Sequence, residues 1–60
     1  MKVLMTYRKS TKNTHVFDEI EEDGSTRDST FALIPTLYIR KLAFKNSSVP
    51  VRITVTVEVD

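Results

Sequence analysis

The sequence has no cysteine and no tryptophan, and only one histidine and one glycine among its 60 residues. Without cysteine, the chain can form neither disulfides nor thiolate metal sites. One imidazole, that of His15, also excludes a metal site built from several histidines. No stretch is long and apolar enough to span a membrane, and "VLM" after Lys2 is too short for the core of a signal peptide. We therefore expect a cytoplasmic protein.

Sixty residues make one small β domain, residues 1–60. A domain of this size buries only about 60% of the surface that its unfolded chain exposes. Below roughly 70–80 residues, small folds usually depend on a disulfide, a metal, unusually good packing or oligomerisation. Because disulfides, thiolate metal sites and His-rich metal sites are excluded here, oligomerisation is the device left open, and we expect a homo-oligomer, most simply a homodimer.

The formal net charge is only +1, but the charges are grouped along the chain. Residues 1–16 carry basic charges alone, residues 17–28 carry mainly acidic ones, and residues 29–52 are again basic alone. Two interpretations follow. The blocks neutralise one another across neighbouring strands, or a basic face is presented to an anionic partner.

The first half of the chain favours a β-hairpin. Lys2–Lys9 is rich in β-forming residues, Ser10–Thr14 has turn chemistry, and His15–Glu22 predicts a second strand. A short loop between two such segments is typical of antiparallel pairing. The polar stretch Glu22–Thr30, with its Asp23-Gly24 dipeptide, predicts the tip of a long hairpin or a mobile loop, and its composition favours the mobile loop.

In the second half, Pro35 disfavours a helix at the residue before it. The sequence predicts a strand over Thr36–Arg40, followed by one helical turn near Lys41–Phe44. From Val49 to Asp60, apolar and polar residues alternate with a period of two, which predicts a long, half-buried antiparallel strand.

These segments predict an all-β fold: a small antiparallel sheet, barrel or sandwich of about four to five strands with at most one short helical turn. We expect Phe17 and Phe44 in the core, a half-exposed His15, and leave the tyrosines open between core and surface. The apolar residues available are about enough to cover the alternating face of the last segment, but not both faces of the first strand as well. A long, regular strand near a terminus also risks leaving an unpaired edge, and pairing with a second copy would solve both problems.

No catalytic constellation is present. His15 has no partner at a known spacing, and the acidic cluster between Asp18 and Asp23 lacks the ligand spacing of a Ca²⁺ loop. There is no Gly-rich phosphate loop and no activated nucleophile. We therefore expect a non-enzymatic protein with no catalytic residue, metal, cofactor or small-molecule substrate.

Basic residues beside aromatic ones form the candidate binding site. Small β-barrels bind single-stranded nucleic acid by stacking bases on aromatic side chains within a positive groove. The candidate nucleic-acid-binding residues are Arg8, Lys9, Lys12, Tyr38, Arg40, Lys41 and Lys45. The alternative is that the aromatic residues only build the core.

Two segments, "YRKSTKNTHVF" and "IPTLYIRKLAF", resemble small bacteriophage and bacterial proteins of unknown function. Those proteins share a Y-x-K-x-T-K-x-T-H-V opening, an acidic middle and a P-T-L-Y-I-x-K-x-A segment. The matching positions are Tyr7, Lys9, Thr11, Lys12, Thr14, His15, Val16, Pro35–Ile39, Lys41 and Ala43. The resemblance implies no activity.

A weaker similarity links "LYIRKLAF" and "VRITVTVEV" to swapped-hairpin transcription factors, which are dimeric DNA binders. This sequence lacks their Gly-Asp before the last strand. Together these observations lead us to expect a small protein that binds nucleic acid through a basic face, with a bacteriophage as one candidate source. The alternative is a protein-binding or assembly module that acts through an exposed strand edge or through the acidic loop.

Overall fold

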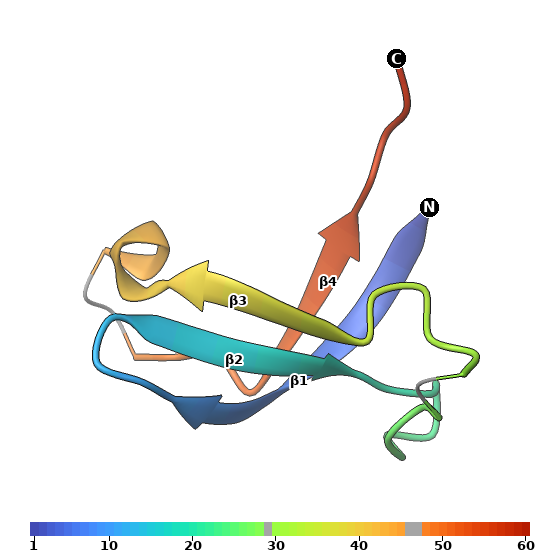
Figure 1. The fold of residues 1–60 in the computed structure, drawn as a ribbon, viewed down its shortest axis with the longest axis horizontal. Coiled ribbons are helices and arrows are strands. Elements are labelled where there is room, and N and C mark those ends of the chain that lie inside the picture. The colour runs from blue at the N-terminus through green and yellow to red at the C-terminus, as the bar shows by residue number, and fades with distance from the viewer. Residues whose placement is uncertain (29, 46–47) are drawn as a thin grey trace.

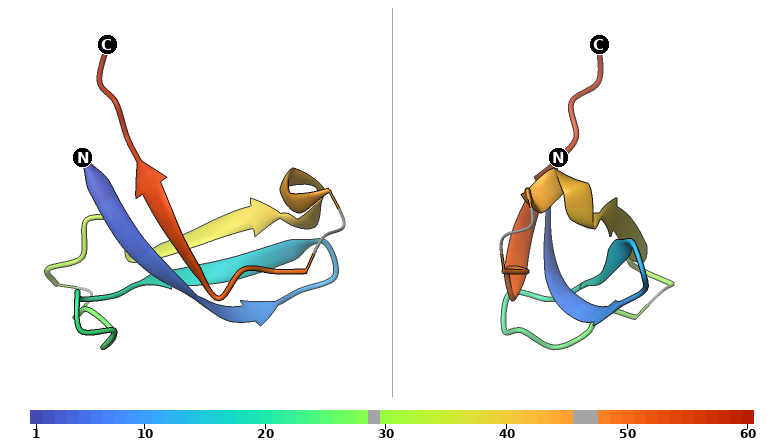
Figure 2. Two further views of the ribbon diagram at one scale, coloured as in Figure 1. Left: turned by 180° about the vertical axis from the view of Figure 1, so that it is seen from behind. Right: turned by 90° about the vertical axis from the view of Figure 1, so that its left-hand side faces the viewer.

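The computed structural model describes residues 1–28, 30–45 and 48–60 as one antiparallel sheet with a short helical turn. Its elements are β1 (Lys2–Ser10), β2 (Thr14–Glu19), β3 (Thr36–Arg40), the 3-10 helix η1 (Lys41–Phe44) and β4 (Arg52–Thr56). The four strands lie in the order β3-β2-β1-β4 (Figure 1). The sheet curls into a half-barrel, which Figure 2 shows from behind and from one side. The predicted all-β fold is confirmed.

A β-bulge interrupts the pairing of β1 with β2. Tyr7 is opposite Phe17 and Lys9 is opposite Val16, so Arg8 is the extra residue on β1. Because a bulge shifts the alternation of side chains by one residue, Arg8 and Lys9 are both placed on one face. Tyr7 and Ser10 consequently share the other face, although three positions separate them.

The sheet has two different faces. The concave face, inside the curl, carries the core residues Val3, Met5 and Phe17, all buried. Half-buried residues from the other elements pack against this core: Tyr7, Ile34, Leu37, Ile39, Phe44, Val49, Ile53 and Val55. The convex face is the outer one and includes Val16, which pairs with Tyr38 on β3. The prediction that Phe17 lies in the core is confirmed, and Phe44 lies at its border.

The segment from β3 to η1 follows the sequence prediction closely. β3 begins after Pro35, and η1 follows directly after Arg40. Lys45 ends the helix in the left-handed conformation, with φ 51°, and its N–H donates to the Leu42 carbonyl. The Lys41 N–H donates to the Asn13 carbonyl at 2.9 Å, which joins the start of η1 to the β1–β2 turn.

Two predicted strand ends are wrong. β2 ends at Glu19 rather than at Glu22, because the chain then turns and Ile20 makes a single bridge to Thr26. β4 covers only Arg52–Thr56 rather than the whole run from Val49 to Asp60. Alternation predicts which residues share a face, but a strand is also defined by its pairing, and the register of β4 with β1 runs only from Arg52 to Thr56.

The alternating face of the last segment is only partly covered. Ile53 and Val55 are half-buried against the core, whereas Val51 is 75% exposed and Val59 is 94% exposed. The single chain therefore gains much less stability from this face than full burial of its valines would supply.

Candidate functional site

A row of three side chains crosses the convex face of the sheet. Val16 on β2 is directly opposite Lys9 on β1 and Tyr38 on β3, so all three project from the same side. Val16 is fully buried although it lies on the outer face, whereas Tyr38 is 64% exposed. We infer that the neighbouring aliphatic and aromatic groups cover Val16, while most of Tyr38 remains available to solvent. For Tyr38, the choice between core and surface is decided in favour of the surface.

Three of the predicted basic residues come together at one end of the sheet. Lys12 in the β1–β2 turn, Arg40 at the end of β3 and Lys41 at the start of η1 line one shallow hollow with Asn13 and Leu42. The hydrogen bond from Lys41 N–H to the Asn13 carbonyl brings these segments together. None of the three basic residues takes part in an ion pair among the described residues.

Arg40 links this basic hollow to the row that contains Tyr38. It is two residues after Tyr38 on β3, and its cross-strand partner is Thr14 on the convex face. Because alternate residues of a strand project from the same side, Arg40 and Tyr38 share that face. We call Lys9, Lys12, Tyr38, Arg40 and Lys41 the tyrosine–basic surface.

Arg8 and Lys45 contribute less to this surface. The Arg8 Nε lies 3.1 Å from Asp18 Oδ2, and the other carboxylate oxygen, Oδ1, accepts from Thr36 Oγ1 at 3.1 Å. Arg8 is therefore partly neutralised by an acid on the same face. Lys45 lies beyond η1 and does not line the hollow that Lys12, Arg40 and Lys41 share.

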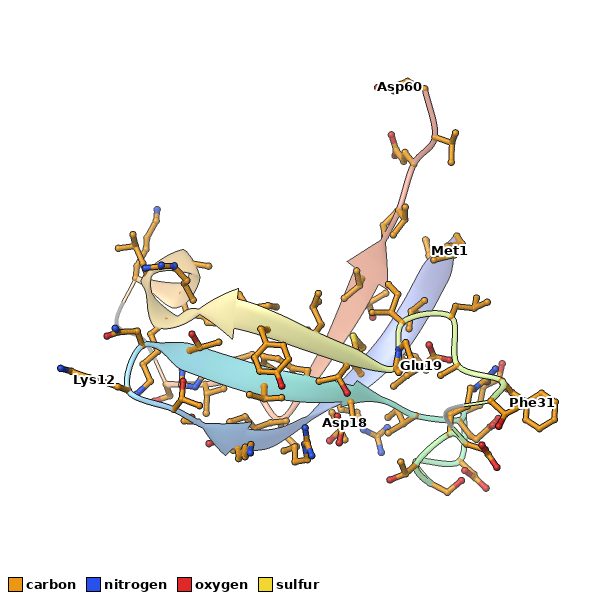
Figure 3. All side chains as sticks on the ribbon, viewed as in Figure 1. Met1, Lys12, Asp18, Glu19, Phe31 and Asp60 are labelled. Carbon is orange, nitrogen blue, oxygen red and sulfur yellow. The ribbon has the colours of Figure 1, made fainter. Side chains whose placement is uncertain are left out.

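The acidic residues gather at the opposite end of the molecule. Figure 3 shows Lys12 at one end of the sheet and Glu19 with Phe31 at the other. Glu19 is a buried carboxylate, 4% exposed, whose Oε1 accepts from the N–H groups of Leu33 and Ile34 at 2.9 and 2.8 Å. Its Oε2 lies 3.1 Å from Arg27 Nε. The Nε–H group makes no hydrogen bond there, so this contact is an ion pair alone.

Glu19 thus holds together the loop that joins β2 to β3. Arg27 also pairs with Glu21 at 3.0 Å, so one guanidinium bridges two carboxylates. The loop keeps the acidic groups away from the tyrosine–basic surface. The acidic loop is therefore separated from Lys12, Arg40 and Lys41, whereas Lys2 and Arg52 of the basic blocks lie near it and Arg8 pairs with Asp18.

Two carboxylates in this loop close local turns. The Asp23 carboxylate accepts from the backbone N–H of Ser25 at 2.9 Å and from its hydroxyl at 2.7 Å. The backbone hydrogen bond, followed by the hydroxyl, lowers the pKa of Asp23. Asp28 accepts from the Thr30 N–H at 2.8 Å, and its hydrogen bonds to the Thr30 backbone and side chain likewise lower its pKa.

Sequence reasoning missed a polar cluster on the concave side. The Tyr7 hydroxyl is 2.7 Å from Ser10 Oγ, which is 2.6 Å from His15 Nδ1. The His15 ring also packs against Tyr7 and Phe44, with ring centroids 5.8 and 5.7 Å apart. His15 is only 9% exposed, so the expectation of a half-exposed histidine is wrong.

The cluster explains why a histidine is tolerated at this buried position. Ser10 reaches the concave face because of the bulge at Arg8, and its hydroxyl satisfies a ring nitrogen that burial would otherwise leave unpaired. A serine–histidine contact could suggest nucleophilic chemistry. However, no described carboxylate hydrogen-bonds to the other ring nitrogen, so the orienting third group of a triad is missing.

Comparisons with known proteins add no homologue. No protein-family model matches the chain, and no curated protein or solved structure is significantly similar to it. No helix in the described part of the chain has the length and apolarity that a membrane span requires. The evidence on function is therefore the geometry of the molecule itself, and its main feature is an exposed tyrosine bordered by basic side chains that lack acidic partners among the described residues.

Proposed function

We propose that this chain is a non-enzymatic nucleic-acid-binding protein that acts as a homodimer, in the cytoplasm of a bacterium or of a phage-infected cell. The observation that carries the proposal is the tyrosine–basic surface. Tyr38 is 64% exposed on a convex face, and Lys9 and Arg40 are on the same side of the sheet. An aromatic ring held on a rigid strand beside cations provides both stacking and phosphate contacts.

Single-stranded nucleic acid fits this surface better than duplex. Duplex bases are stacked on one another, so an exposed ring gains little from them, whereas every base of a single strand offers a free face. The basic hollow of Lys12, Arg40 and Lys41 lies at the end of the strand that carries Tyr38. A single-stranded nucleic acid with one base stacked on Tyr38 would place the phosphates next to that base toward this hollow.

Fluorescence anisotropy with labelled single- and double-stranded oligonucleotides at about 50 mM salt tests the proposal. We expect binding at tens of micromolar protein or tighter, stronger for single strands, and weakening steeply as salt rises because phosphate contacts release counterions. Lys41→Ala should weaken binding about equally for all sequences and flatten the salt slope by about one unit.

Lys45→Ala is the matched control, because Lys45 lies close in sequence but does not line the hollow. It should change affinity and salt slope less than Lys41→Ala does. Failure to bind any oligonucleotide at tens of micromolar protein would refute the proposal, because non-specific binders usually reach that range.

The second candidate function is protein binding or assembly, and one observation favours it. β4 lies at the edge of the sheet, and Val51 and Val59 beside it are largely exposed. Unpaired strand edges with exposed apolar residues bind other strands. If oligonucleotides do not bind, this edge becomes the leading candidate for function.

A further inference from the structure

The free edge of β4 has a defined hydrogen-bonding pattern. Met1 and Val57 exchange both backbone hydrogen bonds, at 2.8 and 2.9 Å, and the Tyr7 N–H donates to the Val51 carbonyl at 2.8 Å. In an antiparallel ladder, hydrogen-bonded residues alternate with residues whose backbone groups point away. The N–H and C=O groups of Arg52, Thr54 and Thr56 therefore face outward, where no described strand pairs with them.

The alternation of β4 also extends beyond its pairing with β1. The last backbone hydrogen bonds between the two segments join Met1 and Val57, and the alternation continues through Val59 to Asp60. Val59 is 94% exposed, and Val57 is 38% exposed. In Figure 1 this terminal segment projects away from the sheet. A row of exposed valines with strand periodicity beside an open strand edge favours pairing with a strand of another chain.

We propose that the β4 segment, residues 51–59, pairs antiparallel with the same segment of a second copy, with Val55 on the two-fold axis. The proposal specifies the assembly part of the proposed function but does not depend on nucleic-acid binding. A two-fold interface brings the same segment of both chains together. Each residue of the segment must therefore match the residue that lies opposite it in the second copy.

The sequence of the segment is self-complementary in this register. Directly opposite residues have position numbers that sum to 110, so Arg52 of one copy meets Glu58 of the other, and the two-fold axis repeats this ion pair. Thr54 meets Thr56, which is a favourable cross-strand pair. On the concave side Val51 meets Val59, Ile53 meets Val57, and Val55 meets itself, so each apolar residue gains an apolar neighbour.

Neighbouring registers lack this agreement. With Thr54 on the axis, Arg52 is opposite Thr56 and Glu58 is opposite Pro50, so neither charge has a partner. With Thr56 on the axis, Arg52 meets Asp60, but Glu58 is opposite Thr54. If the position numbers of opposite residues summed to 109 or 111 instead of 110, polar residues of one copy would lie opposite apolar residues of the other.

Arg52 is available for this contact. It makes no ion pair among the described residues, and one of its guanidinium nitrogens lies 2.8 Å from the position that a side chain on Gly24 would occupy. A change in its side-chain torsions moves it from Gly24 to the partner strand. The other edge, β3, suits pairing less well, because Pro35 precedes it and Arg40 and Lys41 end it.

A charge-exchange experiment tests the proposal in the absence of nucleic acid. Sedimentation equilibrium should show a dimer for the unaltered protein. Arg52→Glu and Glu58→Arg should each weaken dimerisation at least tenfold, because each single variant places like charges opposite one another. An equimolar mixture of the two variants should restore the dimer as a heterodimer, since both of its charge pairs are again opposite in sign.

Recovery in the mixture also excludes simple misfolding of the single variants. A monomeric unaltered protein, single variants that dimerise as it does, or a mixture no better than its components would each overturn the interface. None of these results bears on the anisotropy experiment, so failure of the interface is distinguishable from failure of nucleic-acid binding.

Disulfide trapping tests the register. Because the chain has no cysteine, Val55→Cys introduces a single thiol at the position that would meet itself across the axis. Under mild oxidation this variant should form a covalent dimer faster than Thr54→Cys or Thr56→Cys, whose copies are offset from each other along the strands. Faster trapping of either threonine variant would overturn the proposed axis.

Discussion

At the scale of single residues, Tyr38 is an aromatic side chain that the core does not use. Its ring is mostly exposed, yet its cross-strand partner Val16 is fully buried on the same face. The ring therefore has two separable roles. The cross-strand pairing predicts that the ring helps to cover Val16, and the proposed function requires its exposed part to stack on a base.

Substitutions at Tyr38 can separate these roles. Tyr38→Phe should bind single strands nearly as well as the unaltered protein, whereas Tyr38→Leu should lose about 1–3 kcal/mol of binding free energy while still covering Val16. Anisotropy gives the affinity, and thermal unfolding followed by circular dichroism gives the stability. Equal binding by the leucine variant would show that the ring does not stack. A large loss of stability in both variants would instead mean that Tyr38 acts mainly as a structural residue.

Asp23 and Asp28 allow a prediction about pH. Hydrogen bonds from Ser25 and Thr30 favour the ionised carboxylates and lower both pKa values. A carboxyl group with a lowered pKa in the folded state stabilises the fold above its unfolded pKa, and this contribution is lost as the pH falls through the folded pKa. The loop should therefore lose stability at pH values below about 4.

Titration of the carboxyl carbons by NMR measures both groups. Both midpoints should lie below the value for an unfolded aspartate. Ser25→Ala removes the hydroxyl donor but keeps the backbone N–H, so it should raise the pKa of Asp23 partway and leave Asp28 unchanged. Midpoints at the unfolded value would show that the two turns do not form in solution.

At the scale of elements, the sequence predicts a segment well where a particular residue or a change of pattern marks its start or its end. Pro35 marks the start of β3, and the change of pattern after Arg40 marks the 3-10 turn, so both agree with prediction. The predicted β4 is too long, because alternation indicates that one face of a segment is buried and the other exposed, but not how far the neighbouring strand pairs with it. The burial of His15 was not predictable either, since it depends on a bulge that rotates Ser10 inward.

In the candidate site, too, the residue types are predictable from the sequence, whereas their contacts with other strands are not. The sequence indicates the basic residues and Tyr38 as candidates, but it does not show that Arg8 is paired with Asp18 or that Lys45 lies outside the hollow. Those outcomes depend on cross-strand register. Glu19 was missed as a structural residue because a carboxylate in a weak strand pattern gives no sign of burial.

The long β2–β3 connection should depend on Glu19. Glu19→Ala leaves the N–H groups of Leu33 and Ile34 without their acceptor and Arg27 without one of its ion pairs, so we expect a loss of about 3 kcal/mol in the free energy of unfolding. Glu19→Gln retains an acceptor oxygen and should cost less. Urea unfolding measures both variants. Glu22→Ala, at an exposed position of the same loop, is the control, and an equal effect there would contradict the anchoring role of Glu19.

At the scale of the whole molecule, the proposed dimer and the proposed nucleic-acid surface use different edges. β4 is at one edge of the sheet, and β3, which carries Tyr38, is at the other. Joining two copies through β4 gives one continuous sheet with a tyrosine–basic surface near each end. The two β3 strands are then separated by about seven strand spacings, roughly 34 Å along a flat sheet and less along a curled one. A nucleic-acid strand long enough to reach both surfaces would bind more tightly than one that reaches a single surface.

Thermal stability should depend on protein concentration. The core of fully buried apolar residues on the concave face is limited to Val3, Met5 and Phe17 among the described residues, so the interface is expected to contribute a substantial share of the stability. If unfolding and dissociation are coupled, the enthalpy of a small dimer implies a rise in Tm of about 6 °C for each tenfold increase in concentration. Thermal unfolding followed by circular dichroism from about 5 µM to 500 µM protein measures this dependence of Tm on concentration.

Arg52→Glu should lower Tm over the whole range, whereas Lys12→Glu, a similar charge change in the β1–β2 turn, should keep the concentration dependence of the unaltered protein. A Tm that stays constant across the range would mean that the monomer is stable alone, and that pairing at β4, if it occurs, is not needed for folding.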